Sequence, residues 1–312
     1  MTRAQWYEIW IPRSGPYTLA AVRIIVALQA LWILLSRDPA GISAMPDVIW
    51  QGELPERKIR FLLMQGIPDI EFVLWCIAIA SVLCVLVGYR VRIFGIVAAL
   101  LCYHLAPLQA LLNYTTPWGK GLTIATLALV VLACSPCEDR WAIASRHEVR
   151  PHQSYGWAVM LIRLLFAQIY LFSAVARLNT VGWDWAKLET VRNHILVFRL
   201  AEPSLDTPLN AFLVAHPVLC SFLAVGTLLF ELFFVAAVFI PAARLPLALA
   251  GVLFHTGLWF TMGFRFPNLA HFALFIDFKG EAKTKPQIER DDDSKKSPST
   301  TSSITAATPG TP

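Results

Sequence analysis

Apolar runs close to the length of a membrane-spanning helix recur along this chain, and they constrain its fold more than any other feature. A helix needs about 20 apolar residues to cross a bilayer, because each residue adds only about 1.5 Å. Inside a bilayer the backbone must satisfy its own hydrogen bonds, so these runs predict helices. They fall at 17–36, 70–87, 93–112, 122–135, 157–178, 217–240 and 245–264, with a shorter final piece at 267–278.

The predicted fold class is therefore all-α: a polytopic transmembrane helical bundle of about seven to eight spans. The composition agrees, since 56% of the residues are hydrophobic and only 15% are charged, whereas a soluble domain carries about 25% charged residues. No small-residue cleavage site follows the first run, so we expect it to be retained as a span. Several uncleaved helices favour an integral, multi-pass protein of an inner or plasma-type membrane.

Polar segments connect and follow the apolar runs. Residues 37–65 and 179–216 mix apolar with charged side chains, which predicts interfacial amphipathic helices and loops at the membrane surface. Residues 279–312 are first charged and then rich in Ser, Thr and Pro, so we expect a disordered tail. The predicted domain organisation is a bundle at 1–278 and a tail at 279–312.

The distribution of Lys and Arg between the loops does not fix the orientation of the bundle. We favour a cytoplasmic N-terminus, and with this orientation eight basic residues lie inside before the tail and nine lie outside. The eight are Arg3, Arg13, Arg90, Arg92, Arg140, Arg146, Arg150 and Arg244, and the nine are Arg37, Arg57, Lys58, Arg60, Lys120, Lys187, Arg192, Arg199 and Arg265. The basic tail lies inside only if the final apolar piece crosses the membrane.

Composition also excludes some classes of function. The net charge of +5 is modest and no basic tract is interleaved with aromatic residues, so we expect no nucleic-acid partner. The six cysteines are scattered and imply no disulfide framework. Cys134 and Cys137 form a single C-x-x-C, which would suit a redox centre or half of a metal site. Because no second pair follows, we favour ordinary packing and predict no metal site.

Charged residues inside the apolar runs are the candidates for function. Arg163, Tyr170 and Arg177 are spaced seven apart in the run at 157–178, so they share one stripe of a helix. An arginine within a span costs at least about 2.5 kcal/mol and normally faces the bundle interior or a wet cavity. This stretch is therefore both a membrane anchor and a candidate site.

Further polar residues lie in other apolar runs, namely Arg23, His104, Glu231, His255 and His271. One glutamate among several arginines predicts an ion pair, for which Arg163 is the favoured partner of Glu231, and it leaves an excess of positive charge. Such an excess suits a phosphate, a carboxylate or a quinone carbonyl. The alternative is that these residues only fix the register of the helices.

The order of several short motifs resembles the HTTM (horizontally transferred transmembrane) domain family, which includes vitamin K-dependent γ-glutamyl carboxylase. Arg163 precedes Gln168-Ile169-Tyr170 and Ser173-Ala174-Val175-Ala176-Arg177-Leu178, and Trp183 or Trp185 follows. The family shows there an arginine, a tyrosine, a segment like A-G-V-K-K-L and a tryptophan. The resemblance covers about residues 17–278 and is supported by Gly88-Tyr89-Arg90-Val91, Cys134-Ser135-Pro136, Trp141, Phe230-Glu231-Leu232, Phe254-His255 and Met262-Gly263-Phe264.

The resemblance to the carboxylase implies a bundle that binds a reduced quinone, oxidises it to a strong base and carboxylates glutamate. Two positions depart from that enzyme. Arg177 stands where the carboxylase has its lysine base, and the loop at 113–118 lacks the histidine that the carboxylase has there. A guanidinium stays protonated, so Arg177 donates hydrogen bonds but does not abstract a proton. We therefore expect no glutamyl carboxylase activity.

The favoured hypothesis is a membrane protein that binds a quinone, reduced and vitamin K-like, or another lipid-like ligand in a polar intramembrane cavity. An enzyme of this kind would be a carboxylase-related lyase or oxidoreductase whose catalytic residues are Arg177, Tyr170 and His255. Arg177 would anchor an anionic oxygen, and the other two would move protons. The expected ligand-binding residues are Arg163, Glu231, Arg23 and Trp259.

Three alternatives remain open. The chain could be a vitamin K-dependent carboxylase-like enzyme, a transporter or a non-enzymatic membrane assembly factor. A transporter would show repeated halves with broken helices, and no clear internal repeat is visible in the sequence. Membrane lipid and a small-molecule or quinone ligand are the expected partners.

Overall fold

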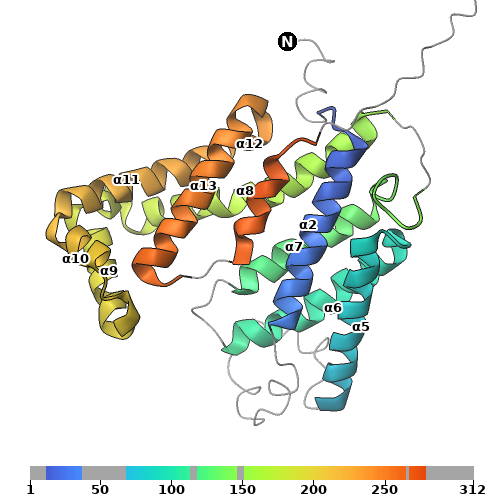
Figure 1. Cartoon of the computed structure of the whole chain (residues 1–312), viewed down its shortest axis with the longest axis horizontal. Coiled ribbons are helices and arrows are strands. Elements are labelled where there is room, and N and C mark those ends of the chain that lie inside the picture. The colour runs from blue at the N-terminus through green and yellow to red at the C-terminus, as the bar shows by residue number, and fades with distance from the viewer. Residues whose placement is uncertain (1–11, 37–67, 113–117, 146–150, 265–266, 279–312) are drawn as a thin grey trace, which may run out of the picture. The chain divides into compact units, whose positions relative to one another are not determined.

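The computed structural model describes residues 12–36, 68–112, 118–145, 151–264 and 267–278, and within these ranges helices are the only regular secondary structure (Figure 1). This confirms the predicted all-α class. The α-helices are α2 (Pro16–Leu35), α5 (Pro68–Val87), α6 (Val91–Leu112), α7 (Trp118–Ala133), α8 (Gln153–Thr180), α9 (Leu188–Ala201), α10 (Pro208–Ala215), α11 (Pro217–Phe233), α12 (Ala236–Phe239) and α13 (Pro241–Met262). Three 3₁₀ helices join them: η2 (Gly182–Ala186), η3 (Pro203–Leu205) and η4 (Pro267–Phe275).

Local sequence explains where several of these helices begin and end. Proline occupies the first turn of α2, α10, α11 and α13, where its missing N–H group costs no hydrogen bond. The Thr207 side chain accepts a hydrogen bond from the backbone N–H of Asn210 at 3.2 Å and caps α10. Gly263 ends α13 with a φ of 70°, a left-handed conformation that glycine adopts without steric cost.

Four helical segments are long and apolar enough to cross a membrane: Pro16–Leu35, Gln153–Thr180, Pro217–Phe239 and Pro241–Met262. Each coincides with a predicted span, which supports an integral membrane protein. Shorter apolar helices cover Phe72–Val87, Val91–Leu105 and Ile124–Ala133 in the described part of the chain. The total of seven to eight spans therefore stays a prediction.

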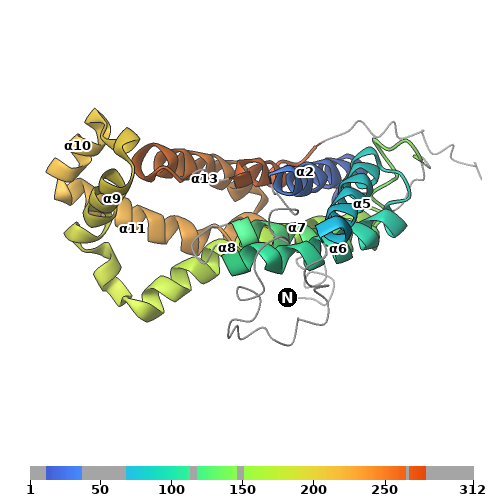
Figure 2. The same cartoon turned by 90° about the horizontal axis from the view of Figure 1, so that it is seen from below.

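Contacts among the helices form two groups that share α8. In the first, α2 packs against α5, α7 and α8, and α6 packs against α5 and α7. In the second, α11 packs against α8, α9 and α13, and α9 and α10 gather at one end of α11 and α13 (Figure 2). The 3₁₀ helix η4 contacts α2, α13 and α8, so it lies where the two groups meet.

Small residues allow the helices to approach one another closely. Ala20, Ala27 and Ala30 of α2 are fully buried, as expected for membrane helices that associate through small side chains. One close approach is at Gly251 of α13, where an added Cβ would lie 2.1 Å from the Phe272 ring of η4. Glycine is therefore required at this point for η4 to pack against α13.

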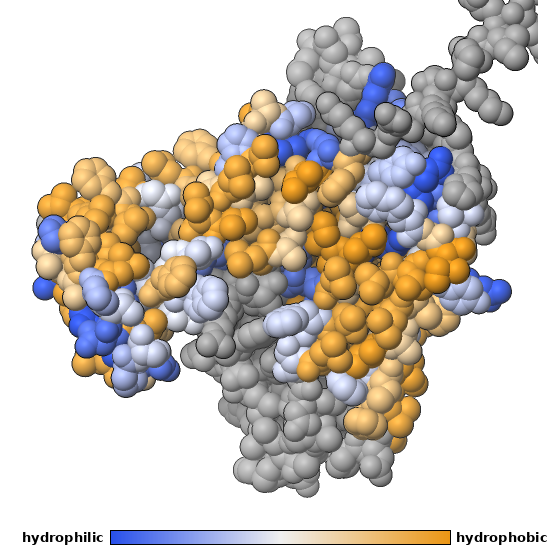
Figure 3. Space-filling view, in the orientation of Figure 1, coloured by the Kyte–Doolittle hydropathy of each residue, from blue (hydrophilic) through white to orange (hydrophobic). Residues whose placement is uncertain are grey.

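The face of the molecule that Figure 3 shows carries extensive apolar surface over the described helices. Large side chains such as Trp32, Leu100, Phe172, Phe222 and Leu253 are exposed on α2, α6, α8, α11 and α13. A soluble monomer rarely exposes apolar patches of this extent. Lipid is the solvent that suits this surface.

The predicted polar segments have different outcomes. The surface helix and loop expected at 179–216 form η2, α9, η3 and α10, with a small core of Ile195, Leu213 and Cys220. The final apolar piece at 267–278 contains η4, whose Phe272, Leu274 and Phe275 are buried. The amphipathic segment expected at 37–65 and the tail expected at 279–312 lie outside the described residues.

Candidate functional site

Arginines within the apolar helices mark three separate polar networks. Arg23 lies in α2, and Arg163 and Arg177 lie in α8. Each guanidinium needs partners inside the protein, because a charge at the bilayer centre costs at least about 2.5 kcal/mol. The partners differ, and they separate structural arginines from a candidate binding residue.

Arg23 is fully buried and holds the loop that follows α7. Its Nη1 donates to the carbonyl oxygens of Cys137 and, at 3.3 Å, of Arg140, and its Nη2 donates to the carbonyl oxygen of Trp141. Three carbonyls of one loop are thus satisfied by one side chain from α2. Arg23 was predicted to bind a ligand, and the structure places it apart from the other predicted site residues.

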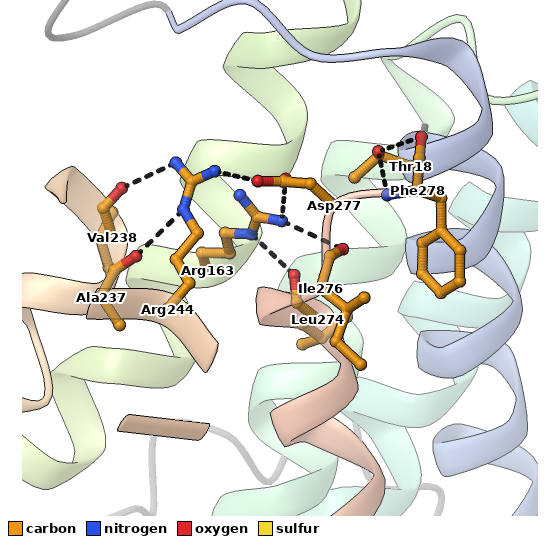
Figure 4. A network of polar contacts seen from close by, with 9 residues as sticks. All are labelled: Thr18, Arg163, Ala237, Val238, Arg244, Leu274, Ile276, Asp277 and Phe278. Atoms are coloured by element: carbon orange, nitrogen blue, oxygen red, sulfur yellow. Dashed lines mark hydrogen bonds and ion pairs between the residues drawn. The ribbon is translucent and has the colours of Figure 1, made fainter. Parts of the chain in front are cut away.

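Arg163 belongs to a second network, which it shares with Arg244 of α13 (Figure 4). Arg163 Nη2 donates to Asp277 Oδ1 at 2.8 Å, and Arg244 Nη1 donates to Asp277 Oδ2. Arg163 also donates from Nε to the carbonyl oxygen of Leu274 at 2.7 Å and from Nη2 to that of Ile276 at 3.5 Å. We call Arg163, Arg244 and Asp277 the carboxylate clamp. It fastens the chain at the end of η4 to α8 and α13.

The carboxylate clamp corrects one prediction from the sequence. Arg163 was expected to pair with Glu231, and this is wrong, because Arg163 pairs with Asp277. Spacing along α8 gives the face on which Arg163 lies but not the element that covers that face. Neither Arg244 nor Asp277 was assigned a role from the sequence. The one available signal was the presence of a carboxylate, Asp277, within the final apolar piece at 267–278.

The electrostatics of the carboxylate clamp favour an ionised Asp277. Burial alone would raise the pKa of this carboxyl group, but the guanidinium groups of Arg163 and Arg244 together outweigh burial. The pKa of Asp277 therefore lies below its ordinary value of 3.8. With two arginines to one carboxylate, the clamp carries a net positive charge.

Arg177 belongs to the third network, near the end of α8. Its Nη1 donates to Glu231 Oε2 of α11 in an ion pair. The Glu231 side chain is buried, whereas 28% of the Arg177 side chain is exposed. Only 3% of the Arg163 side chain is exposed. Among Arg23, Arg163 and Arg177, Arg177 is the one that combines a buried ionic partner with access from outside.

Trp185 of η2 covers the Arg177–Glu231 pair. The Arg177 guanidinium carbon lies 4.7 Å from the centroid of the Trp185 ring, which is within the range of a cation–π interaction. The indole Nε1 atom of Trp185 is buried and has no hydrogen-bond partner among the described residues. A buried N–H donor without an acceptor is rare in proteins. We call Arg177, Trp185 and Glu231 the arginine site.

A neutral polar pair lies two turns before Arg177 on α8. The Tyr170 hydroxyl is 3.4 Å from His255 Nε2 of α13, and His255 Nδ1 is 2.9 Å from the Gly251 carbonyl oxygen. The carbonyl can only accept, so it fixes the proton of a neutral imidazole on Nδ1 and leaves Nε2 to accept from the tyrosine. The pair is arranged for proton exchange between the hydroxyl and the imidazole.

Aromatic rings enclose the Tyr170–His255 pair. The Tyr170 ring lies 4.7 Å from Phe234, 5.4 Å from Phe230 and 6.0 Å from Phe272, measured between centroids. Such distances are typical of packed aromatic pairs. The residue that precedes Glu231 is part of this enclosure, so the aromatic cluster and the arginine site are adjacent on α11.

The three α8 residues of the predicted stripe thus contact three different sets of partners. Seven residues of helix span about 10 Å, so Tyr170 lies about midway between Arg163 and Arg177 along the axis. The structure brings Arg177, Glu231, Tyr170 and His255 into one region of α8, α11 and α13. Arg163 lies about 20 Å from Arg177 along α8. Trp259, predicted to bind the ligand, is exposed and stacks on Phe260.

Cysteines and metal ligands add no further site in the described chain. Cys134 and Cys137 are not joined to each other, and the Cys137 Sγ donates to the Leu132 carbonyl oxygen at 3.4 Å. Burial raises the pKa of the Cys137 thiol to about 11, so it is a poor nucleophile at neutral pH. The described residues contain no group of three or more His, Cys, Asp or Glu placed to hold a metal ion.

The fold and these networks define an all-helical integral membrane protein with a charged pair buried between its helices. The family model of the HTTM domain matches residues 15–279, most of the chain, so the chain belongs to the HTTM domain family. This confirms the resemblance drawn from the sequence. No curated protein and no solved structure matches the chain.

Proposed function

We propose that this chain is a multi-pass HTTM protein of about seven to eight spans that binds a quinone or another lipid-like ligand at the arginine site. The observation that carries the proposal is the environment of Arg177. This side chain is held by a buried carboxylate and yet is partly exposed beside a buried indole donor. Arg23, by contrast, is fully buried, and its Nη1 and Nη2 atoms donate to carbonyl oxygens of the loop after α7.

The donors of the arginine site suit a ligand oxygen. A guanidinium has five N–H groups, and one hydrogen bond of Arg177 to Glu231 leaves others for a ligand carbonyl or anionic oxygen. Trp185 Nε1 supplies a second donor close to the same guanidinium. Two donors that lie close to each other favour an oxygen acceptor over a hydrocarbon, and the apolar surroundings favour a ligand that carries a hydrophobic body.

The aromatic cluster favours a ligand that is elongated or has a flat ring. Tyr170 lies about 10 Å from Arg177 along α8, so one small ion does not reach both. Phe230, Phe234 and Phe272 pack around the Tyr170 ring. A quinone head fits this arrangement chemically, because it combines carbonyl acceptors with a flat ring.

A bound quinol would supply two-electron redox chemistry, and the residues of the chain supply proton handling. His255 Nε2 is placed to accept the proton of Tyr170, whose hydroxyl can in turn accept one from a ligand. Arg177 holds an oxygen and does not abstract its proton, since a guanidinium stays protonated. For this reason we propose ligand binding without glutamyl carboxylation.

The test is mass spectrometry of the small molecules that copurify with the detergent-solubilised protein and with its Arg177→Ala variant. We expect a stoichiometric quinone or polyprenyl lipid in the wild type and its loss in the variant. Arg192→Ala is the matched control, because Arg192 also pairs with a glutamate but lies on α9 with an exposed partner. Bulk phospholipid alone in all three samples would refute the proposal.

A further inference from the structure

Three hydrogen bonds gather the beginning of α2, the beginning of α8 and the end of η4 at one end of the bundle. Ser14, just before α2, donates its backbone N–H to the His152 carbonyl oxygen just before α8, at 3.3 Å. Phe278, just after η4, donates its backbone N–H to Thr18 Oγ1 of α2 at 3.0 Å and accepts from it at 3.3 Å. We call this end of the bundle the flank end (Figure 4).

Other loops belong to the same end. The Ile143 N–H donates to the Val87 carbonyl oxygen at the end of α5, at 2.9 Å, so the loop after α7 also lies there. The Trp141 ring in that loop is 5.6 Å from Tyr17 and 6.2 Å from Phe278, measured between centroids. The carboxylate clamp adds the beginning of α13 through Arg244 and Asp277.

The 3₁₀ helix η4 returns the chain to the flank end. Helix α13 begins at the flank end with Arg244 and ends at Met262, so the chain must come back before it reaches Phe278. Phe272 and Phe275 of η4 are buried between α2, α8 and α13. A short 3₁₀ segment is tolerated at membrane depth only where protein surrounds it. His271, Phe272, Leu274 and Phe275 of η4 are buried, whereas Leu269 is exposed.

The arginine site lies at the opposite end. Helix α8 begins at the flank end and has 28 residues, so Arg177 is about 36 Å further along its axis. The Asn210 side chain of α10 donates to the Thr261 carbonyl oxygen at 3.1 Å, which places α10 at the C-terminal end of α13. Phe198 of α9 also contacts Phe264, with 4.7 Å between ring centroids.

Because the chain returns to the flank end after α13, the number of basic residues differs between the two sides of the membrane. Before Phe278 the two sides hold eight and nine lysines and arginines, so neither side is favoured. The sequence after Phe278 contains no run that is long and apolar enough to cross a bilayer, so no further crossing is expected after Phe278. It adds six basic residues within about 20 residues of the last apolar segment: Lys279, Lys283, Lys285, Arg290, Lys295 and Lys296.

We infer that the flank end faces the cytoplasm and that the arginine site opens to the opposite leaflet, which supplies its ligand. Cytoplasmic segments carry the excess of Lys and Arg, and with the tail the flank end holds fourteen against nine. The assignment of the ligand to the outer leaflet rests on the function proposed above, whereas the orientation does not.

Thiol labelling of single-cysteine variants of the full chain tests this inference. The parent carries alanine in place of Cys76, Cys84 and Cys134, the native cysteines that are not buried among the described residues. Ile143→Cys probes the flank end, since 77% of this side chain is exposed. Ser204→Cys probes the exposed connection between α9 and α10, and a cysteine added after Pro312 probes the tail.

A membrane-impermeant maleimide is applied to intact spheroplasts and to permeabilised ones, and labelling is normalised to that of the denatured protein. We expect Ser204→Cys to react in intact spheroplasts and the other two variants to react only after permeabilisation. Labelling of all three from one side would overturn the separation of the two ends. Labelling of Ile143→Cys and of the added cysteine from opposite sides would overturn the inference that the chain returns to the flank end. A fully reversed labelling pattern would overturn the cytoplasmic orientation of the flank end.

Two controls are needed to interpret the labelling results. The parent without an added cysteine gives the background, and an unchanged melting temperature in detergent shows that each variant is folded. Loss of the copurifying lipid in Arg177→Ala is measured separately from labelling. A failure of the proposed function is thus distinguishable from a failure of the orientation.

Discussion

Replacement of Asp277 by asparagine removes the carboxylate that the guanidinium groups of Arg163 and Arg244 share. The side chains of these arginines are only 3% and 10% exposed, so Asp277→Asn leaves two enclosed charges that repel each other. The Asp277 side chain itself is 40% exposed, and solvent therefore screens part of each pair.

The expected cost lies between two limits. Loss of one partner from a fully buried ion pair costs about 3–5 kcal/mol, and an exposed pair contributes at most about 1 kcal/mol. Arg163 keeps its hydrogen bonds to the Leu274 and Ile276 carbonyl oxygens in the variant. We therefore expect Asp277→Asn to lower the free energy of unfolding by about 2–3 kcal/mol.

Thermal unfolding in detergent, followed by tryptophan fluorescence, measures this effect. At about 2–4 °C per kcal/mol for a chain of a few hundred residues, the melting temperature should fall by about 4–12 °C. Asp206→Asn is the matched control, because it removes an exposed carboxylate that pairs with Arg199, and we expect a loss of at most about 1 kcal/mol.

A double variant separates charge from packing. Arg244→Met in the Asp277→Asn background removes one of the two uncompensated charges, so the combined loss should be smaller than the sum of the single losses. If Asp277→Asn lowers the melting temperature no more than Asp206→Asn does, the carboxylate clamp does not hold η4 in place and the reasoning is refuted.

Three further predictions concern stability in detergent. The pKa of Asp277 is lower in the folded chain, so the stability that Asp277 contributes is complete above about pH 4 and should be lost as the pH falls through the folded-state pKa. In that pH range the melting temperature of the wild type should fall more than that of Asp277→Asn. Parallel curves of melting temperature against pH for the two proteins would contradict this. Gly251→Ala should cost about 1–3 kcal/mol because the new Cβ overlaps the Phe272 ring. Gly257→Ala on the same helix meets no atom within 4 Å and should be neutral or stabilising. Equal melting temperatures for the two variants would argue against the close approach of η4 to α13. Arg23→Met leaves buried carbonyl oxygens without donors and should cost on the order of 3–5 kcal/mol, which a melting temperature within 2–4 °C of the wild type would exclude.

Sequence alone predicts the spans because hydrophobic length is a local property. The run predicted at 17–36 corresponds to the helix Pro16–Leu35, and that at 217–240 to the segment Pro217–Phe239. The run at 157–178 lies within α8, which is longer at both ends. Helix ends depend on proline and glycine positions and on polar contacts, so the boundaries are less well defined than the spans.

The partners of charged residues are not a local property. Arg163 and Arg177 share a stripe of α8, so the sequence allows Glu231 on another helix to pair with either one. The axial position of α11 relative to α8 determines that Glu231 pairs with Arg177. That register depends on η2 and α10, which no periodicity describes. Asp277 becomes a partner of Arg163 only because η4 returns through the bundle.

Some of the residues proposed for binding can be recognised from the sequence, and others only from their contacts in the structure. Arg177, Tyr170 and His255 stand out in the sequence because polar residues are rare in apolar runs. Trp185 does not stand out, since tryptophan is common at membrane interfaces. Its role follows from its contact with Arg177 and its buried Nε1 atom, which only the structure shows.

Photoaffinity labelling with a quinone that carries a diazirine tests whether a quinone binds at Arg177. The labelled peptides of the detergent-solubilised protein are mapped by mass spectrometry, with and without an excess of the unlabelled quinone. The proposed site predicts saturable labelling of the segment that joins α8 to η2, around Arg177 and Trp185, and its loss in Arg177→Ala. Labelling spread over the exposed apolar faces, unchanged by the excess or by the variant, would contradict a ligand site at Arg177.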